Sequence, residues 1–190
     1  MTFCGYFSSS PVAALAEIVV PDSDITTTGW SYGGGDLYQA LAIRTETNFV
    51  ISTPSTTVCP TRSIEQFEVG LASPSSVPGD ASVQGIRFLF KVRHEAGTIP
   101  PTNPSSEWTI RLYEGTVATG TLIQSFSGYN SPATLLQWSS EFSEDMPPAS
   151  VAAITDHNDL SFDVEVGMCA DVGNIEAHMA YVQLQYYALP

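Results

Sequence analysis

Charged residues are scarce in this sequence, and basic ones are scarcest. They make up 14% of the 190 residues, and 6 Lys and Arg stand against 20 Asp and Glu, for a net charge of −14. Exposed helix faces are usually built from Lys, Glu and Arg, so the shortage disfavours a helical protein. Nucleic acids and anionic membranes both select clustered Lys and Arg. The composition therefore predicts no direct nucleic-acid partner and no membrane partner.

Cysteine is also rare, and its spacing excludes two common sites. The three cysteines, Cys4, Cys59 and Cys169, form no C-x-x-C pair. A zinc ribbon and a thioredoxin-type redox motif are thereby excluded. Buried reduced cysteines are the prediction, without an obligatory disulfide, although a single bridge such as Cys4 to Cys59 remains open.

Long hydrophobic runs are absent as well. No apolar run approaches the ~18 residues of a membrane span. The first apolar stretch has no Lys or Arg before it. A secretory signal normally begins with such a basic region, so no signal peptide is expected.

The sequence does contain strong two-residue alternation, most clearly in residues 159–187. Two alternating runs there are separated by the turn residues Asp171, Gly173 and Asn174. This pattern predicts a central antiparallel hairpin with one apolar face and one polar face. The apolar residues change parity near residues 179–181, which predicts a bulge. The expected inner face is Phe162, Val164, Val166, Val182 and Leu184, and the expected outer face is Asp163, Glu165, Tyr181, Gln183, Gln185 and Tyr187.

Shorter alternating runs recur along the rest of the chain. They predict strands at residues 17–20, 48–53, 63–72, 83–95, 107–114, 121–127 and 134–142, with a turn at residues 21–24. Residues 37–41 fit either a short helical turn or a strand, and a second helical turn is expected at 146–154. The predicted fold class is all-β: an antiparallel β-sandwich, jelly-roll-like, with one or two short helical turns and an N-terminal arm. Residues 1–16 form the arm, and residues 17–190 form a single β-sandwich domain.

Catalytic and metal-binding motifs are weak or missing. There is no G-x-S-x-G, and Asp163 and Glu165 fall on a polar strand face where solvated carboxylates are normal. Asp156, Asn158 and Asp159 supply oxygen ligands that Ca²⁺ could use, but turn formation explains the same residues. The sequence predicts a protein that is not an enzyme, with no cofactor and no metal.

Aromatic residues leave a binding role open. Ring faces on a sheet could stack on sugars, as in a carbohydrate-binding module, or pack against another subunit. The residues considered are Trp30, Tyr32, Tyr38, Trp108, Trp138, Tyr181 and Tyr187.

Three short motifs carry a family resemblance. They are Pro21-Asp22-x-Asp24 followed by Gly29-Trp30, then Asp159-Leu160 opening a long strand, and the closing run of residues 181–186. In these the chain is similar to small all-β virion proteins of tailed bacteriophages: head decoration (cement) proteins, head fibres and tail-surface proteins. The resemblance implies a jelly-roll or related sandwich, a structural role and a homo-oligomer, with a trimer favoured. It implies no functional residue.

The resulting hypothesis is a non-enzymatic virion structural protein. It would be assembled in the host cytoplasm, lie on the outer surface of the capsid and stabilise it as a decoration protein, with the major capsid protein or other virion proteins as partners. The alternative is a lectin-like carbohydrate-binding β-sandwich, free or at a phage tail or fibre. Partner contacts are expected at Phe3, Tyr6 and Phe7 of the arm and at Tyr181, Gln183, Gln185 and Tyr187.

Overall fold

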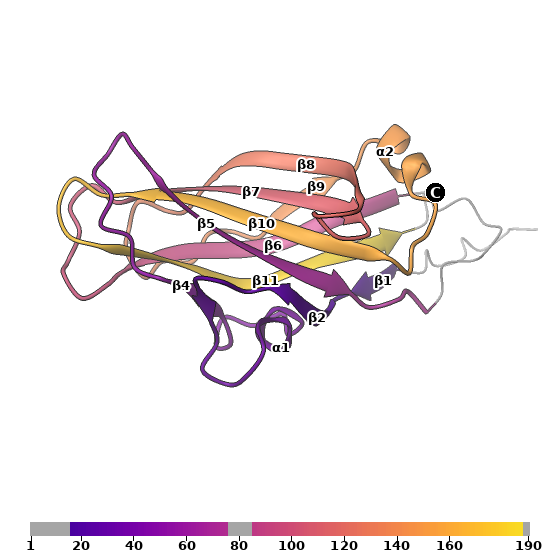
Figure 1. The fold of residues 1–190 in the computed structure, drawn as a ribbon, viewed down its shortest axis with the longest axis horizontal. Coiled ribbons are helices and arrows are strands. Elements are labelled where there is room, and N and C mark those ends of the chain that lie inside the picture. The colour runs from indigo at the N-terminus through magenta and orange to yellow at the C-terminus, as the bar shows by residue number, and fades with distance from the viewer. Residues whose placement is uncertain (1–15, 76–84, 188–190) are drawn as a thin grey trace, which may run out of the picture.

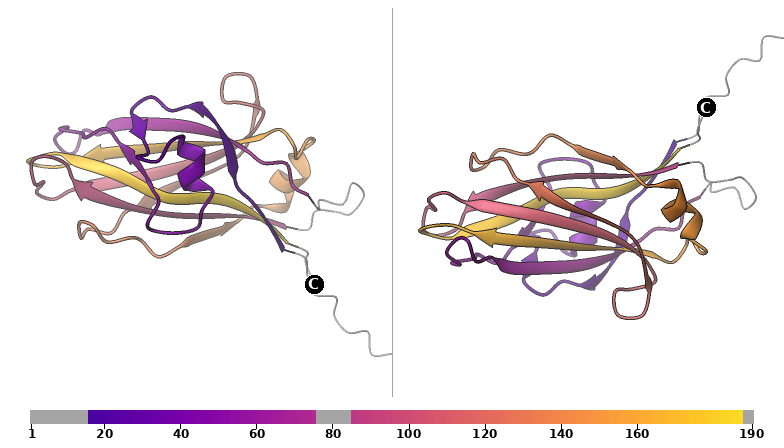
Figure 2. Two further views of the ribbon diagram at one scale, coloured as in Figure 1. Left: turned by 90° about the horizontal axis from the view of Figure 1, so that it is seen from below. Right: turned by 90° about the horizontal axis from the view of Figure 1, so that it is seen from above.

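Two antiparallel sheets face each other in a computed structural model that describes residues 16–75 and 85–187 (Figures 1 and 2). Sheet A has the order β3 (Trp30–Ser31), β4 (Val50–Ser52), β11 (Ile175–Tyr187), β6 (Gly85–Ala96) and β9 (Phe142–Asp145), and β1 (Ala16–Val19) also pairs with β11. Sheet B has the order β2 (Pro21–Thr26), β5 (Ser63–Leu71), β10 (Leu160–Cys169), β7 (Ser105–Glu114) and β8 (Thr121–Asn130). The predicted all-β sandwich is confirmed.

The strand pairs are nested in the manner of a jelly roll. The hairpin β7–β8 is innermost, and the pairs β6·β9, β5·β10 and β4·β11 enclose it in turn. This long ribbon folds over so that β11 also pairs with β6, and β10 with β7. Each sheet therefore contains strands from both ends of the ribbon, which is the double Greek-key arrangement of a jelly roll.

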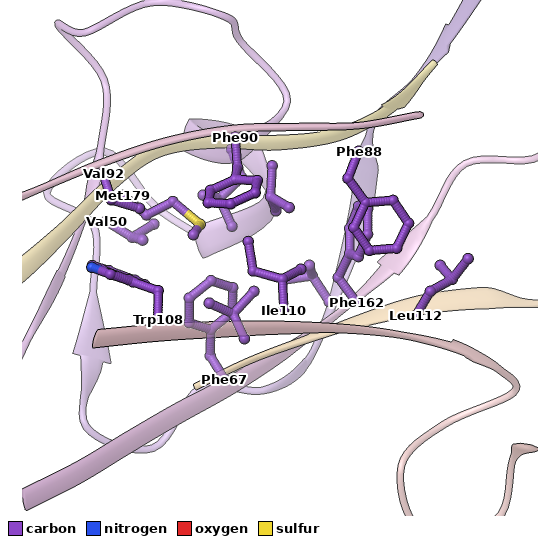
Figure 3. Close-up of a cluster of buried hydrophobic side chains, with 14 of the residues drawn as sticks. Val50, Phe67, Phe88, Phe90, Val92, Trp108, Ile110, Leu112, Phe162 and Met179 are labelled. Atoms are coloured by element: carbon purple, nitrogen blue, oxygen red, sulfur yellow. The ribbon is translucent and has the colours of Figure 1, made fainter. Parts of the chain in front are cut away.

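The core lies between the sheets and is filled from the alternating positions of both (Figure 3). Phe88 of sheet A packs against Phe162 of sheet B, with ring centroids 5.3 Å apart. Trp108 and Phe67 are fully buried in the same layer, to the left of this pair in Figure 3. Burying each such side chain contributes about 1.5–3 kcal/mol, so the alternating strands are held mainly by this layer.

The closing strands do not form the predicted hairpin. β10 lies in sheet B and β11 in sheet A, so the turn at residues 170–174 crosses from one sheet to the other. Each strand is central in its own sheet. Alternation identifies the inward face of a strand but not its neighbour, which is why the pairing prediction is wrong. The predicted bulge is confirmed by a register shift between Met179 and Tyr181.

Two short segments also differ from the prediction. Residues 21–24 belong to β2 rather than to a turn, and β9 begins only at Phe142, after a loop that was expected to be a strand. Residues 37–41 form a helix, α1 (Leu37–Leu41), which decides between the two alternatives, and the second helical turn is confirmed as α2 (Pro148–Ala153). Within the described ranges, neither helix is long and apolar enough to cross a membrane.

The start of α1 is held by a distant side chain. Asp36 occupies the N-cap position but its side chain makes no capping hydrogen bond. Instead, the carboxylate of Asp24 on β2 accepts hydrogen bonds from the backbone N–H groups of Leu37 and Tyr38, both at 2.8 Å. Capping of this kind ties α1 to the edge of sheet B.

A disulfide joins Cys59 and Cys169, whose Cα atoms are 5.1 Å apart. The prediction of reduced cysteines is therefore wrong for this pair, and Cys4 lies outside the described residues. Cys59 precedes β5 and Cys169 ends β10, and these two strands pair along their length. The two cysteines are separated by 110 residues. Only the fold reveals that they are neighbours.

Candidate functional site

The outer face of sheet A carries half of the six basic residues and four of the predicted contact residues. β6 presents Arg87, Lys91 and Arg93 there, opposite residues of β11. Beyond the bulge, Tyr181, Gln183, Gln185 and Tyr187 of β11 share this face because the register shift changes which side chains point outward.

The centre of this face is covered within the monomer. Gln183 is 2% exposed and its Nε2 donates to the carbonyl of Ala42, just after α1. Tyr181 is 4% exposed and donates to Glu141 at 2.5 Å. The expectation of an open outer face is wrong for these two residues, because α1 and the loop before β9 fold over the middle of β11. Their role as partner contacts stays a prediction.

An ion pair between Arg44 and Glu141 anchors that cover. Burial, followed by the hydrogen bond to Glu141, raises the pKa of Tyr181 to about 12. Burial also acts to raise the pKa of Glu141, but hydrogen bonds from Arg44 and Tyr181 outweigh it and hold that pKa below its ordinary value. Glu141 is thus an ionised acceptor that ties two loops to β11.

An aromatic cluster covers the next part of the face. The rings of Phe49 and Trp138 pack edge to face, and the Arg93 guanidinium lies over both, at 4.7 and 4.5 Å from their centroids. His178 stacks on Phe49 with centroids 5.0 Å apart. Arg93 and His178 thus already occupy ring faces of this cluster that a sugar would need for stacking. Two further candidates for sugar stacking, Trp30 and Trp108, are buried in the core.

Near the end of β11 the face is open, in what we name the open patch: Ile18, Arg87, Asp145, Gln185 and Tyr187. Arg87 donates to both carboxylate oxygens of Asp145, at 2.7 and 3.1 Å. The Tyr187 hydroxyl donates to Asp145 at 2.9 Å, and Arg87 lies 5.2 Å from the Tyr187 ring centroid. The hydrogen bond from Arg87 holds the pKa of Asp145 below its ordinary value.

The open patch combines an apolar side chain with preorganised polar groups. Ile18 is 39% exposed and lies opposite Gln185 in the β1–β11 pair. Sequence reasoning identified Gln185 and Tyr187. It missed Ile18, because nothing in a four-residue strand indicates which side stays exposed.

The N-terminal arm joins the domain beside the open patch. Ala16, the first described residue, pairs with Tyr187. Tyr187 in turn pairs with Gly85 on the other side. The predicted contact residues Phe3, Tyr6 and Phe7 lie outside the described residues, so their role stays a prediction.

The carboxylates on the outer face of sheet B are occupied by structural partners. Asp163 is 1% exposed and accepts from Arg111 at 2.8 Å and from Gln66 at 2.5 Å. A second nitrogen of Arg111 donates to Glu165 at 3.0 Å. A glycosidase requires two carboxylates that reach a substrate from opposite sides. Asp163 and Glu165 instead share one guanidinium, so their arrangement is that of a structural ion-pair network.

The oxygen-rich loop at residues 156–159 forms a local turn. Asp156 accepts from the backbone N–H of Asn158 at 2.9 Å and from its side-chain amide at 3.1 Å. This is the turn chemistry expected of Asp and Asn. Across residues 16–75 and 85–187, no group of three or more His, Cys, Asp or Glu side chains is placed to hold a metal ion. Asp159 follows in the same turn, where its N–H donates to the carbonyl of Asp156.

Comparison with known proteins gives only distant structural likenesses. No family model and no curated protein matches the chain. The structure of infectious bursal disease virus Gt strain matches with a TM-score of 0.43 and 10% identity, covering 98% of this chain and 36% of the viral chain. SGBP-B from a complex xyloglucan utilization locus in Bacteroides uniformis gives 0.45 and 11%, covering 88% and 49%.

A third likeness is to TmCBM61 in complex with β-1,4-galactotriose, with a TM-score of 0.38 and 13% identity, covering 89% of this chain and 86% of that one. The chain thus has distant similarity to a viral protein and to sugar-associated proteins. Likenesses this remote carry no argument about what it binds, and the jelly-roll assignment rests on its own strand order.

Proposed function

We propose that this protein is a non-enzymatic virion structural protein of a tailed bacteriophage, acting as a decoration protein on the outer surface of the capsid. The observation that carries the proposal is the open patch. It is the part of the sheet A outer face left uncovered near the end of β11, and the N-terminal arm joins the domain beside it. A patch beside the point where the described chain begins, at Ala16, suits docking onto a capsid lattice.

The charge distribution supports a protein partner over a nucleic acid. All six Lys and Arg side chains form an ion pair with a carboxylate of the same chain. Phosphate binding depends on cations that can exchange their counterions for phosphates. Basic side chains that are already paired, on a chain of net charge −14, suit contact with protein rather than with packaged genome.

The disulfide supports a location outside the reducing cytoplasm in the mature particle. Disulfides persist on virion surfaces and in other oxidising environments, whereas cytosolic thiols are kept reduced. Cys59 and Cys169 would therefore be thiols during assembly and would bond after release of the particle. The bridge would then fix the loop before β5 to the end of β10 in the released particle.

The test is co-sedimentation of the full chain with phage capsids that lack it. The parent chain is expected to bind in a fixed copy number per capsid. Tyr187→Ser is expected to weaken binding at least about tenfold, since it removes the ring and hydroxyl at the centre of the open patch. Tyr113→Ser, a half-buried tyrosine on the other sheet, is the matched control and is expected to bind normally.

Absence of capsid binding by the parent chain would overturn the proposal. Equal loss with Tyr187→Ser and Tyr113→Ser would also count against it, because the effect would not be local to the patch. A glycan array addresses the lectin-like alternative: selective retention of a sugar by the parent chain would replace the decoration role with that of a carbohydrate-binding module.

A further inference from the structure

Three loops meet at one end of the sandwich, and each exposes an aliphatic side chain. They connect β4 to β5, β6 to β7 and β10 to β11, and they gather at the left end of Figure 1. Their exposed side chains are Val58 at 59%, Ile99 at 58% and Val172 at 62%. These are the largest exposed fractions of any large aliphatic residue in the described part of the chain. We name these three residues the apolar tip.

Backbone hydrogen bonds join two of the three loops. The Asn174 N–H donates to the carbonyl of Ile99 at 3.0 Å. The Thr102 N–H donates to the carbonyl of Val172 at 2.9 Å. Ile99 and Val172 are therefore held on neighbouring segments of backbone.

The third loop is attached to the same turn on both sides of Val58. Thr57 precedes Val58, and its carbonyl accepts a hydrogen bond from the Ala170 N–H at 3.0 Å. Cys59 follows Val58 and is bonded to Cys169. The apolar tip is thus preorganised, so a partner could bind it without first ordering the three loops.

Carboxylates border the apolar tip. The three loops contain two charged residues, Arg62 and Asp171, and Arg62 is paired with Glu107. Glu95 and Glu176 lie directly opposite each other on β6 and β11, just outside the loops. We name Glu95, Asp171 and Glu176 the acidic rim.

Glu176 has no cation in the described part of the chain to offset its charge. Glu95 is bound by Arg93 at 3.2 Å, whereas the nearest candidate for Glu176 is His178, at 3.6 Å. With a pKa of about 3, His178 is neutral near pH 7. Burial, followed by the charge of Glu95, raises the pKa of Glu176. Like charges directly opposite in a sheet are destabilising, and a basic group from outside would offset them.

We propose that the apolar tip and its acidic rim form a docking surface for a protein partner whose own apolar contact is bordered by Lys or Arg. An uncharged centre with a polar rim is the usual anatomy of a protein interface. The three loops contain no Trp, Tyr or Phe, so they offer neither a ring for sugar stacking nor an aromatic anchor for a membrane. A second copy would set acidic rim against acidic rim.

The apolar tip and the open patch lie at opposite ends of β11. This strand begins at Ile175, beside the tip, and ends at Tyr187, in the patch. At the usual rise per residue of a strand, these ends are roughly 40 Å apart. A protein held on a surface by its open patch would therefore present the tip to a different partner, whether or not that surface is a capsid.

The test measures binding of two labelled synthetic peptides to the full chain by fluorescence anisotropy. One peptide alternates Leu and Lys, and the other alternates Leu and Glu. The parent chain is expected to bind the Leu-Lys peptide with an affinity that falls as salt is added, and to leave the Leu-Glu peptide free.

Substitutions of exposed aliphatic residues locate the apolar contact. Val58→Ser/Val172→Ser removes two side chains of the tip and should weaken binding of the Leu-Lys peptide at least about tenfold. Ile25→Ser/Leu122→Ser is the matched control, because both residues are exposed on strands of sheet B away from the tip. This control should bind normally. All four positions are exposed, so both variants are expected to fold.

Substitutions of carboxylates locate the basic partner groups. Asp171→Asn/Glu176→Gln removes two charges of the acidic rim and should weaken binding about fivefold, with a smaller salt dependence. Asp22→Asn/Asp36→Asn removes the same number of charges at exposed positions away from the tip and should change binding far less.

A parent chain that binds neither peptide would overturn the proposal. Equal losses in the two serine variants, equal losses in the two charge variants, or equally tight binding of the Leu-Glu peptide would do the same. Binding to phosphatidylcholine vesicles that Val58→Ser/Val172→Ser abolishes would assign the tip to a membrane instead. Capsid binding is read separately: Val58→Ser/Val172→Ser should still co-sediment with capsids, and Tyr187→Ser should still bind the Leu-Lys peptide.

Discussion

Removing the Cys59–Cys169 disulfide should cost this domain a large share of its stability. The perturbation is Cys59→Ala/Cys169→Ala, which breaks the bridge without leaving a lone thiol. The bridge joins the loop before β5 to the end of β10, beside the hydrogen bond from the Ala170 N–H to the Thr57 carbonyl at 3.0 Å. This hydrogen bond can hold the two segments together in the folded double variant, so the native fold is expected to persist without the bridge.

The magnitude follows from the length of chain that the bridge closes. The sequence separation is 110 residues. The chain-entropy relation for a loop of this length gives about 4.8 kcal/mol, while measured bridges more often give 2–4 kcal/mol. We expect a loss of about 3–5 kcal/mol in the free energy of unfolding. In a chain of this size that lowers Tm by about 8–13 °C.

Urea unfolding of the oxidised parent and the double variant measures the loss directly. Mass spectrometry confirms that the bridge is present in the parent. Cys4→Ser is the control, since it removes a thiol outside the bridge and should leave the midpoint unchanged. A double variant within about 1 kcal/mol of a fully bridged parent would refute the reasoning, because the closed loop would then contribute almost nothing.

Three further predictions concern other parts of the structure. Burial, with Arg93 nearby, lowers the pKa of His178 from 6.5 to about 3. Below pH 6.5 the unfolded chain therefore takes up a proton at His178 that the folded chain does not, so stability present above pH 6.5 is lost on acidification. By linkage, unfolding free energy should fall by about 2 kcal/mol from pH 6.5 to 5, and by less in His178→Gln, in pH-resolved urea titrations. Arg111→Met leaves the buried Asp163 carboxylate without its cation and should destabilise the domain by about 2–4 kcal/mol in the same assay at pH 7; an unchanged midpoint would contradict this. Deleting residues 1–15 should weaken capsid co-sedimentation more than it lowers Tm, and an equal loss of both would show that the arm belongs to the fold.

The sequence predicted strands and their buried faces well, because alternation directly reports which side chains leave water. Phe162, Val164 and Leu184 are inward as expected, and the parity change near Met179 and Tyr181 does mark a bulge. Strand partners were harder. The turn after β10 has the residues of a hairpin turn, yet it connects two sheets, and local chemistry is the same in either case.

The candidate site was less predictable than the fold, since it depends on contacts between distant segments. Tyr181 and Gln183 were correctly assigned to an outward face, but the cover formed by α1 and Glu141 comes from residues far away in the chain. The partner of Cys59 was missed for the same reason. Asp24, expected in a turn, caps a helix 13 residues later.

The position of the last two strands has a consequence for synthesis on the ribosome. β10 is the middle strand of sheet B, and β11 holds β1, β4 and β6 together in sheet A. A nascent chain that ends before residue 160 therefore lacks an interior strand of both sheets, and its earlier strands have no adjacent partner except within the β7–β8 hairpin and a few edge pairs. Folding must wait until residues 160–187 have emerged, so a stalled or truncated chain would be a substrate for proteases and chaperones.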